Sequence, residues 1–107
     1  MTQSKLMSDR EVQQFIVNGY TIVRADMGAD FHEGVRKKLD HVFDEEGNPG
    51  NNILPRVPEI RQVFDHPNVR GALTSLLGEG YILNPHRHCH LNPVSSPGQK
   101  WHKDCYV

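Results

Sequence analysis

The chain has 107 residues, a formal net charge of −1 and 23% charged residues. This length allows at most one domain, and the balanced charge excludes the basic footprint of a nucleic-acid-binding or membrane-surface protein. No apolar run approaches the roughly 18 residues that a membrane span requires. The opening stretch MTQSKLMSDREV has no apolar core of a signal peptide, so we expect a cytoplasmic protein.

The first predicted helix begins after Ser8. Ser8 and Glu11 have the three-residue spacing of a capping box, in which each side chain accepts a hydrogen bond from the other residue's backbone. An apolar stripe at helical spacing follows: Val12, Phe15 and Ile16. Gly19 is typical of a helix end. The β-rich residues 20–24 then predict a short strand.

Helical patterns continue to about residue 80. Asp30 and Glu33 repeat the capping spacing at the start of a second predicted helix. Its apolar face contains Phe31, Val35, Leu39, Val42 and Phe43. Residues 58–64 predict a short third helix. Pro67 suits the first turn of the next helix, and Gly78 suits its end.

The sequence changes character in residues 81–107. Residues 81–91 predict a strand, residues 92–98 a turn-forming loop, and residues 101–107 the beginning of another strand. Helices followed by strands favour an α+β protein, with a mainly helical region 1–80 and the first strands of a sheet in 81–107. Because two strands alone are marginal in water, we expect a single incomplete domain that exposes apolar surface and self-associates.

His102 and Asp104 lie two residues apart in the last predicted strand. Side chains at i and i+2 project from the same face of a strand, with Lys103 on the opposite face. An imidazole and a carboxylate are two of the three ligands in a 2-His-1-carboxylate site, which binds Fe(II) and leaves positions open for a cosubstrate and O₂. By itself, the spacing also fits a surface histidine beside an aspartate.

Two stretches, LMSDREVQQFIVNGYTIVR and NPVSSPGQKWHKDCY, resemble the N-terminal part of the phytanoyl-CoA dioxygenase family of Fe(II)- and 2-oxoglutarate-dependent oxygenases. The resemblance implies a double-stranded β-helix (a jelly-roll, cupin-like core), with His102 and Asp104 as iron ligands and 2-oxoglutarate as cosubstrate. It also implies that O₂ hydroxylates an unactivated C–H bond of a small-molecule substrate, with release of succinate and CO₂. The family usually has Gln at the position of Lys103.

The family's second histidine ligand and its 2-oxoglutarate-binding arginine lie downstream of the matched region. We therefore expect residues 1–107 to be the N-terminal portion of such an enzyme. Most of the barrel, the distal histidine and the arginine would then be missing. For this reason we expect the 107-residue chain to be inactive by itself.

Three histidines alternate before the predicted loop: His86, His88 and His90. On one face they could bind Zn²⁺ or Cu²⁺, but neighbours lie about 6–7 Å apart along a strand, so all three reach one ion only if the strand bends. The resemblance suggests instead that His88, His90 and Asn92 contact the substrate or 2-oxoglutarate. A third interpretation is that the histidines are solvated at a sheet edge. Trp101 is either a packing residue or a platform for the substrate.

Two further classes of function remain open. In one, the chain is a non-enzymatic metal-binding or interaction module that uses the His-rich strand 86–90, together with His102 and Asp104. In the other, it is a degenerate relative of the dioxygenases that binds a partner as a scaffold. Cys89 and Cys105 form no C-x-x-C motif, so we expect reduced thiols and no disulfide.

Overall fold

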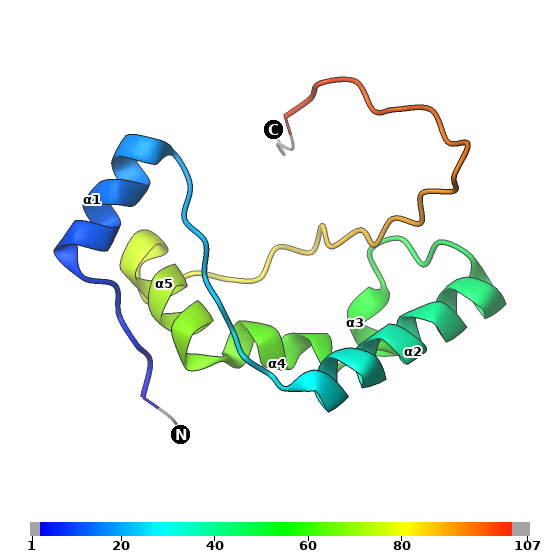
Figure 1. Ribbon diagram of the computed structural model, residues 1–107, viewed down its shortest axis with the longest axis horizontal. Coiled ribbons are helices and arrows are strands. Elements are labelled where there is room, and N and C mark those ends of the chain that lie inside the picture. Colours follow the sequence, from blue (N-terminus) through cyan, green and yellow to red (C-terminus); the bar gives the residue numbers. More distant parts are fainter. Residues whose placement is uncertain (1–2, 104–107) are drawn as a thin grey trace.

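The computed structural model describes residues 3–103. This part of the chain contains five helices: α1 (Asp9–Asn18), α2 (Ala29–Glu46), α3 (Ile53–Arg56), α4 (Ile60–Asp65) and α5 (Pro67–Leu77). After α5 the chain runs back along the helices to the loop that joins α2 and α3, and then arches away from them (Figure 1). The Cα radius of gyration is 16.3 Å, whereas a compact chain of this length would have about 13 Å.

Helix α1 has the predicted signals at both of its ends. The Ser8 backbone N–H donates to Glu11 Oε2 at 2.8 Å, and the Glu11 N–H donates to Ser8 Oγ at 3.3 Å. At the other end, Gly19 adopts the left-handed conformation (φ 78°) and its N–H donates to Phe15 O at 2.8 Å. The predicted helix, its capping box and its glycine stop are therefore confirmed.

Helix α2 begins one residue earlier than its predicted cap. Asp26 Oδ1 accepts from the Gly28 N–H at 3.1 Å, and Gly28, with φ 79°, directs the chain into a helix that starts at Ala29. Glu33 is then too far inside the helix to cap it, and its carboxylate binds Arg36. The prediction of a capping box at Asp30 and Glu33 was wrong, because a local turn upstream had already started the helix.

The hydrophobic core is small and lies between α2 and the short helix α3. Val42, Ile53 and Val57 form its buried cluster. Partly buried side chains pack against this cluster: Val35, Leu39, Leu54, Ile60 and Cys89. Ala72 of α5 is also buried. Many large apolar side chains therefore remain exposed among the described residues, and Ile82, Val94 and Trp101 are the most exposed of them.

Helices α4 and α5 follow the core segment directly. The third predicted helix, residues 58–64, is observed two residues later as α4. The sequence did not predict α3, whose four residues are too few to show a helical repeat. Pro67 is the first residue of α5, and Gly78 ends it with φ 84°, so both predictions for this helix are confirmed.

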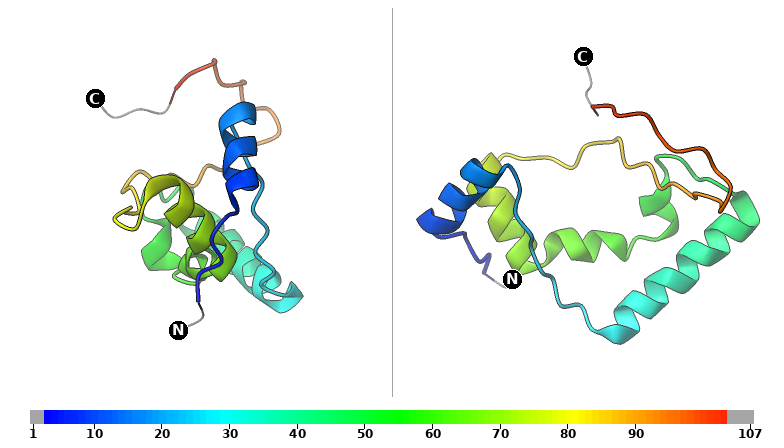
Figure 2. Two further views of the ribbon diagram at one scale, coloured as in Figure 1. Left: turned by 90° about the vertical axis from the view of Figure 1, so that its left-hand side faces the viewer. Right: turned by 45° about the horizontal axis from the view of Figure 1, so that its top comes forward.

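No strand forms anywhere in residues 3–103, neither at 20–24 nor at 81–91. A single antiparallel bridge joins Gly50 to Cys89, whose N–H donates to Gly50 O at 3.3 Å. The predicted α+β class with the first strands of a jelly-roll is therefore wrong: the described chain is helical with a long extended segment (Figure 2). The β-rich composition of the extended segment favours extended backbone, but a β-strand also needs a second strand to pair with along its length.

The final predicted strand, residues 101–107, is likewise absent at 101–103, and its other residues lie outside the described part. None of the helices in residues 3–103 combines the length and the apolar character that crossing a membrane requires.

Candidate metal-binding histidines

His102 lies on the extended segment after the loop 92–98 and is exposed. Its Nδ1 is 2.8 Å from the backbone oxygen of Lys100. A carbonyl oxygen only accepts hydrogen bonds, so Nδ1 donates to Lys100 O in the tautomer that carries a proton on this nitrogen. Histidines that bind metals commonly hold their second nitrogen in this way.

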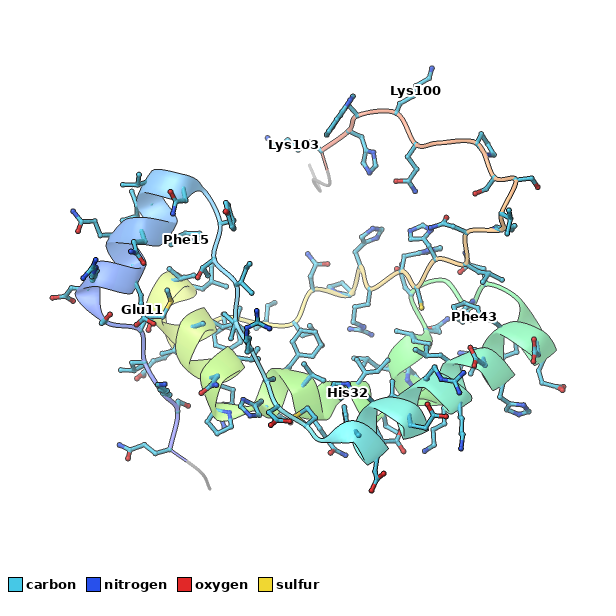
Figure 3. The ribbon with its side chains drawn as sticks, viewed as in Figure 1. Glu11, Phe15, His32, Phe43, Lys100 and Lys103 are labelled. Atoms are coloured by element: carbon cyan, nitrogen blue, oxygen red, sulfur yellow. The ribbon has the colours of Figure 1, made fainter. Side chains whose placement is uncertain are left out.

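The surroundings of His102 are open. Figure 3 shows Lys100 and Lys103 on this extended segment, apart from the five helices. Trp101 is fully exposed, and with Gln99 and Lys100 it lines a shallow hollow of about 350 Å³ beside His102. The predicted second ligand, Asp104, lies outside the described residues. Packing of Trp101 is not observed, and its role as a substrate platform stays a prediction.

His88 and His90 lie together. Their ring centroids are 4.1 Å apart and the ring planes are tilted by 39°. His88 Nδ1 is buried and has no hydrogen-bond partner within the described part of the chain. The Cys89 side chain, between them in the sequence, packs against the core cluster. His88 and His90 are thus in ring contact, although the strand that was expected to place His86, His88 and His90 on one face does not form.

The loop that joins α2 and α3 holds the histidine segment in place. Asn51 Oδ1 accepts from the Arg87 N–H at 3.1 Å, and Gly50 O accepts from the Cys89 N–H. A Cβ atom on Gly50 would lie 3.7 Å from His88 Nε2. The sequence indicated only a turn at these two positions, because the contacts join residues more than 35 positions apart.

The third histidine and the predicted asparagine do not complete a ligand set. The His86 backbone N–H donates to Asn84 Oδ1 at 2.8 Å, and Asn92 is exposed. Across residues 3–103, no three side chains of His, Cys, Asp or Glu are grouped so that they could hold a metal ion. One ion shared by His86, His88 and His90 is therefore not supported.

The resolved pKa shifts lie away from these histidines. A hydrogen bond from Arg56, whose Nη2 is 2.5 Å from Glu46 Oε2, lowers the pKa of the Glu46 carboxyl. Arg36 lowers the pKa of Glu33 in the same way, across 2.7 Å. Both pairs are exposed: Glu33 and Arg36 lie one turn apart in α2, and Glu46 and Arg56 join the end of α2 to α3. They indicate local stabilisation rather than an acid–base catalyst.

A larger hollow, not predicted from the sequence, lies between the N-terminal segment, α4, α5 and residues 79–83. Its volume is about 850 Å³, and its lining includes Leu6, Phe64 and Tyr81 beside Arg61 and Arg70. The lining also carries acidic side chains, so its charge does not select one kind of ligand.

In comparisons with known proteins, the chain matches no family model, no curated protein and no solved structure. The likeness to phytanoyl-CoA dioxygenases therefore depends on the two sequence stretches quoted above.

Proposed function

We propose that this chain is the N-terminal portion of an Fe(II)- and 2-oxoglutarate-dependent dioxygenase of the phytanoyl-CoA dioxygenase type. The observation that carries the proposal is the contact between His102 Nδ1 and Lys100 O at 2.8 Å. A metal-binding histidine commonly holds its second nitrogen through a bond of this kind to a backbone carbonyl, and Asp104 follows His102 by two residues. An imidazole and a carboxylate suit Fe(II). When bound, iron with 2-oxoglutarate would supply the oxidising chemistry that hydroxylates a small molecule and releases succinate and CO₂.

The N-terminal part of the chain adds support. The resemblance predicts a helix, then Gly-Tyr, then a strand; Gly19 and Tyr20 directly follow α1, whereas residues 20–24 form no strand. The exposed apolar residues Ile82 and Trp101 also fit a chain whose extended segment contacts further protein. The proposal places the enzyme in the cytoplasm, a reducing compartment in which the thiol of Cys89 would stay reduced.

Metal binding by the 107-residue chain tests the assignment of His102. Under anaerobic conditions, we expect Fe(II) affinity to fall at least tenfold in His102→Ala and in Asp104→Ala. His41→Ala, which alters an exposed histidine on α2, is the matched control and should bind as the wild type does. Unchanged Fe(II) affinity in His102→Ala would contradict the proposal.

The coding sequence beyond codon 107 tests the wider assignment. We expect an open reading frame that encodes a downstream histidine and then an arginine. The longer protein should convert 2-oxoglutarate to succinate, whereas the 107-residue chain with Fe(II) and ascorbate should not. A stop codon directly after Val107, or succinate formation by the short chain, would be the opposite result.

A further inference from the structure

We propose that His88 and His90 form a second metal site, separate from His102, for a borderline divalent cation such as Zn²⁺ or Cu²⁺. Their rings already lie side by side, with centroids 4.1 Å apart. Neutral imidazole is a preferred ligand of both cations. The pair supplies two nitrogen ligands from one short segment, and water completes the coordination.

The backbone around His88 is fixed before any ion binds. Arg87 and Cys89, on either side of it, donate their N–H groups to Asn51 Oδ1 at 3.1 Å and Gly50 O at 3.3 Å. The Cys89 side chain, between the two histidines, packs against the core cluster and so anchors the segment. Ligands held in this way lose less conformational entropy when they bind an ion.

Gly50 lies near the His88 ring. Its φ of 61° is a conformation that other residues rarely adopt, and a Cβ atom added there would be in ordinary van der Waals contact with the ring, 3.7 Å from His88 Nε2 and 3.8 Å from Cδ2. The loop therefore leaves room for the His88 ring beside Gly50.

One nitrogen of the pair is buried without a hydrogen bond among the described residues. His88 Nδ1 is buried and has no hydrogen-bond partner within the described residues. A polar atom in this situation is unfavourable unless a partner is supplied. A cation coordinated by the pair would supply that partner once the ring turns to expose this nitrogen. Because no third acidic, cysteine or histidine side chain in residues 3–103 joins the pair, we infer an open site rather than a closed structural one.

Calorimetric titration of the 107-residue chain with Zn²⁺ tests this site. In the His102→Ala background, which removes the proposed iron site, we expect about one ion per chain, with affinity at least tenfold weaker when His88→Gln or His90→Gln is added. His86→Gln is the matched control, since this histidine belongs to the same segment but not to the pair. The helices lie elsewhere, so far-UV circular dichroism should be the same for all variants. Full Zn²⁺ affinity in His88→Gln, or an equal loss in His86→Gln, would overturn the proposal.

Cu²⁺ provides a second readout that counts ligands. The electron paramagnetic resonance spectrum should show coupling to two imidazole nitrogens, and each of the two variants should reduce it to one. A spectrum with no nitrogen coupling would contradict the site. His102→Ala separates the two proposals: it should weaken Fe(II) binding and leave Zn²⁺ binding at His88 and His90 unchanged. Either site can then fail without the other.

Discussion

The backbone of Lys5 crosses helix α5 directly over Gly71. A Cβ atom on Gly71 would lie 1.7 Å from Lys5 O and 2.2 Å from its carbonyl carbon. Beside this crossing, the Lys5 N–H donates to Pro67 O at 3.1 Å and the Met7 N–H donates to Ser75 Oγ at 3.0 Å. Only glycine permits such a close approach between a helix and another backbone. The attachment of the N-terminal segment therefore depends on Gly71.

We predict that Gly71→Ala displaces residues 5–7 from α5. The new methyl group cannot coexist with Lys5 O, so the change should destabilise the chain by about 1–3 kcal/mol. Urea unfolding followed by circular dichroism would measure this difference. Hydrogen exchange at the Met7 amide should also become faster, because its bond to Ser75 would be lost.

The matched control is Gly34→Ala in α2. Gly34 is also inside a helix, but nothing lies within 4 Å of its Cβ position. Alanine is a better helix former than glycine by about 1 kcal/mol, so this change should stabilise the chain. Glycine-to-alanine substitution should therefore lower the stability of the chain at position 71 and raise it at position 34. Equal effects at both positions would show that Lys5 does not lie against α5.

The capping box of α1 gives a prediction about pH. The hydrogen bond from the Ser8 backbone, followed by that from the Ser8 hydroxyl, lowers the pKa of Glu11 below its ordinary value of 4.5. A carboxyl group with a lowered pKa in the folded state stabilises that state above pH 4.5, and the contribution disappears as the pH falls through the folded-state pKa. We therefore expect α1 to lose helix content on acidification.

Glu11→Gln and Ser8→Ala separate the parts of this effect. At pH 7, Glu11→Gln should be less stable than the wild type, and the difference should vanish in acid, where both side chains are neutral. Ser8→Ala should destabilise α1 by about 0.5–2 kcal/mol. In a double-mutant cycle, the two changes should be non-additive at pH 7, since both act on the hydrogen bond that Ser8 Oγ donates to Glu11 Oε2 at 2.8 Å. Simple additivity would argue against a reciprocal box.

Local signals in the sequence predicted the helix ends better than the longer patterns predicted strands. The ends of α1 are set by residues no more than four positions apart, so Ser8, Glu11 and Gly19 were enough to predict them. The strand predictions failed because pairing depends on a distant neighbour, and within residues 3–103 the one β-bridge joins Gly50 to Cys89. The segment 86–90 is held instead by long-range contacts with residues 50–51. No local pattern could have predicted them.

The core prediction concerns Val57, whose side chain is fully buried. Val57→Ala removes two methyl groups and leaves a cavity among Val42 and Ile53, so we expect a loss of about 2 kcal/mol. Val94→Ala is the matched control, because Val94 is fully exposed and should change stability by less than about 0.5 kcal/mol. Chemical denaturation of both variants is the measurement, and similar effects would place Val57 outside the core.

The exposed apolar side chains predict self-association. Ile82 and Trp101 are 86% and 104% exposed, and they lie outside the small core. Apolar surface of this kind favours contact with a second molecule, so sedimentation should show species that grow with protein concentration. Ile82→Ser together with Trp101→Ser should reduce this association and leave the helix content unchanged. Val57→Ala should instead increase association, because it loosens the core. An apolar dye should then bind more strongly. A monodisperse wild-type monomer that melts in one sharp transition would mean that these side chains do not drive association.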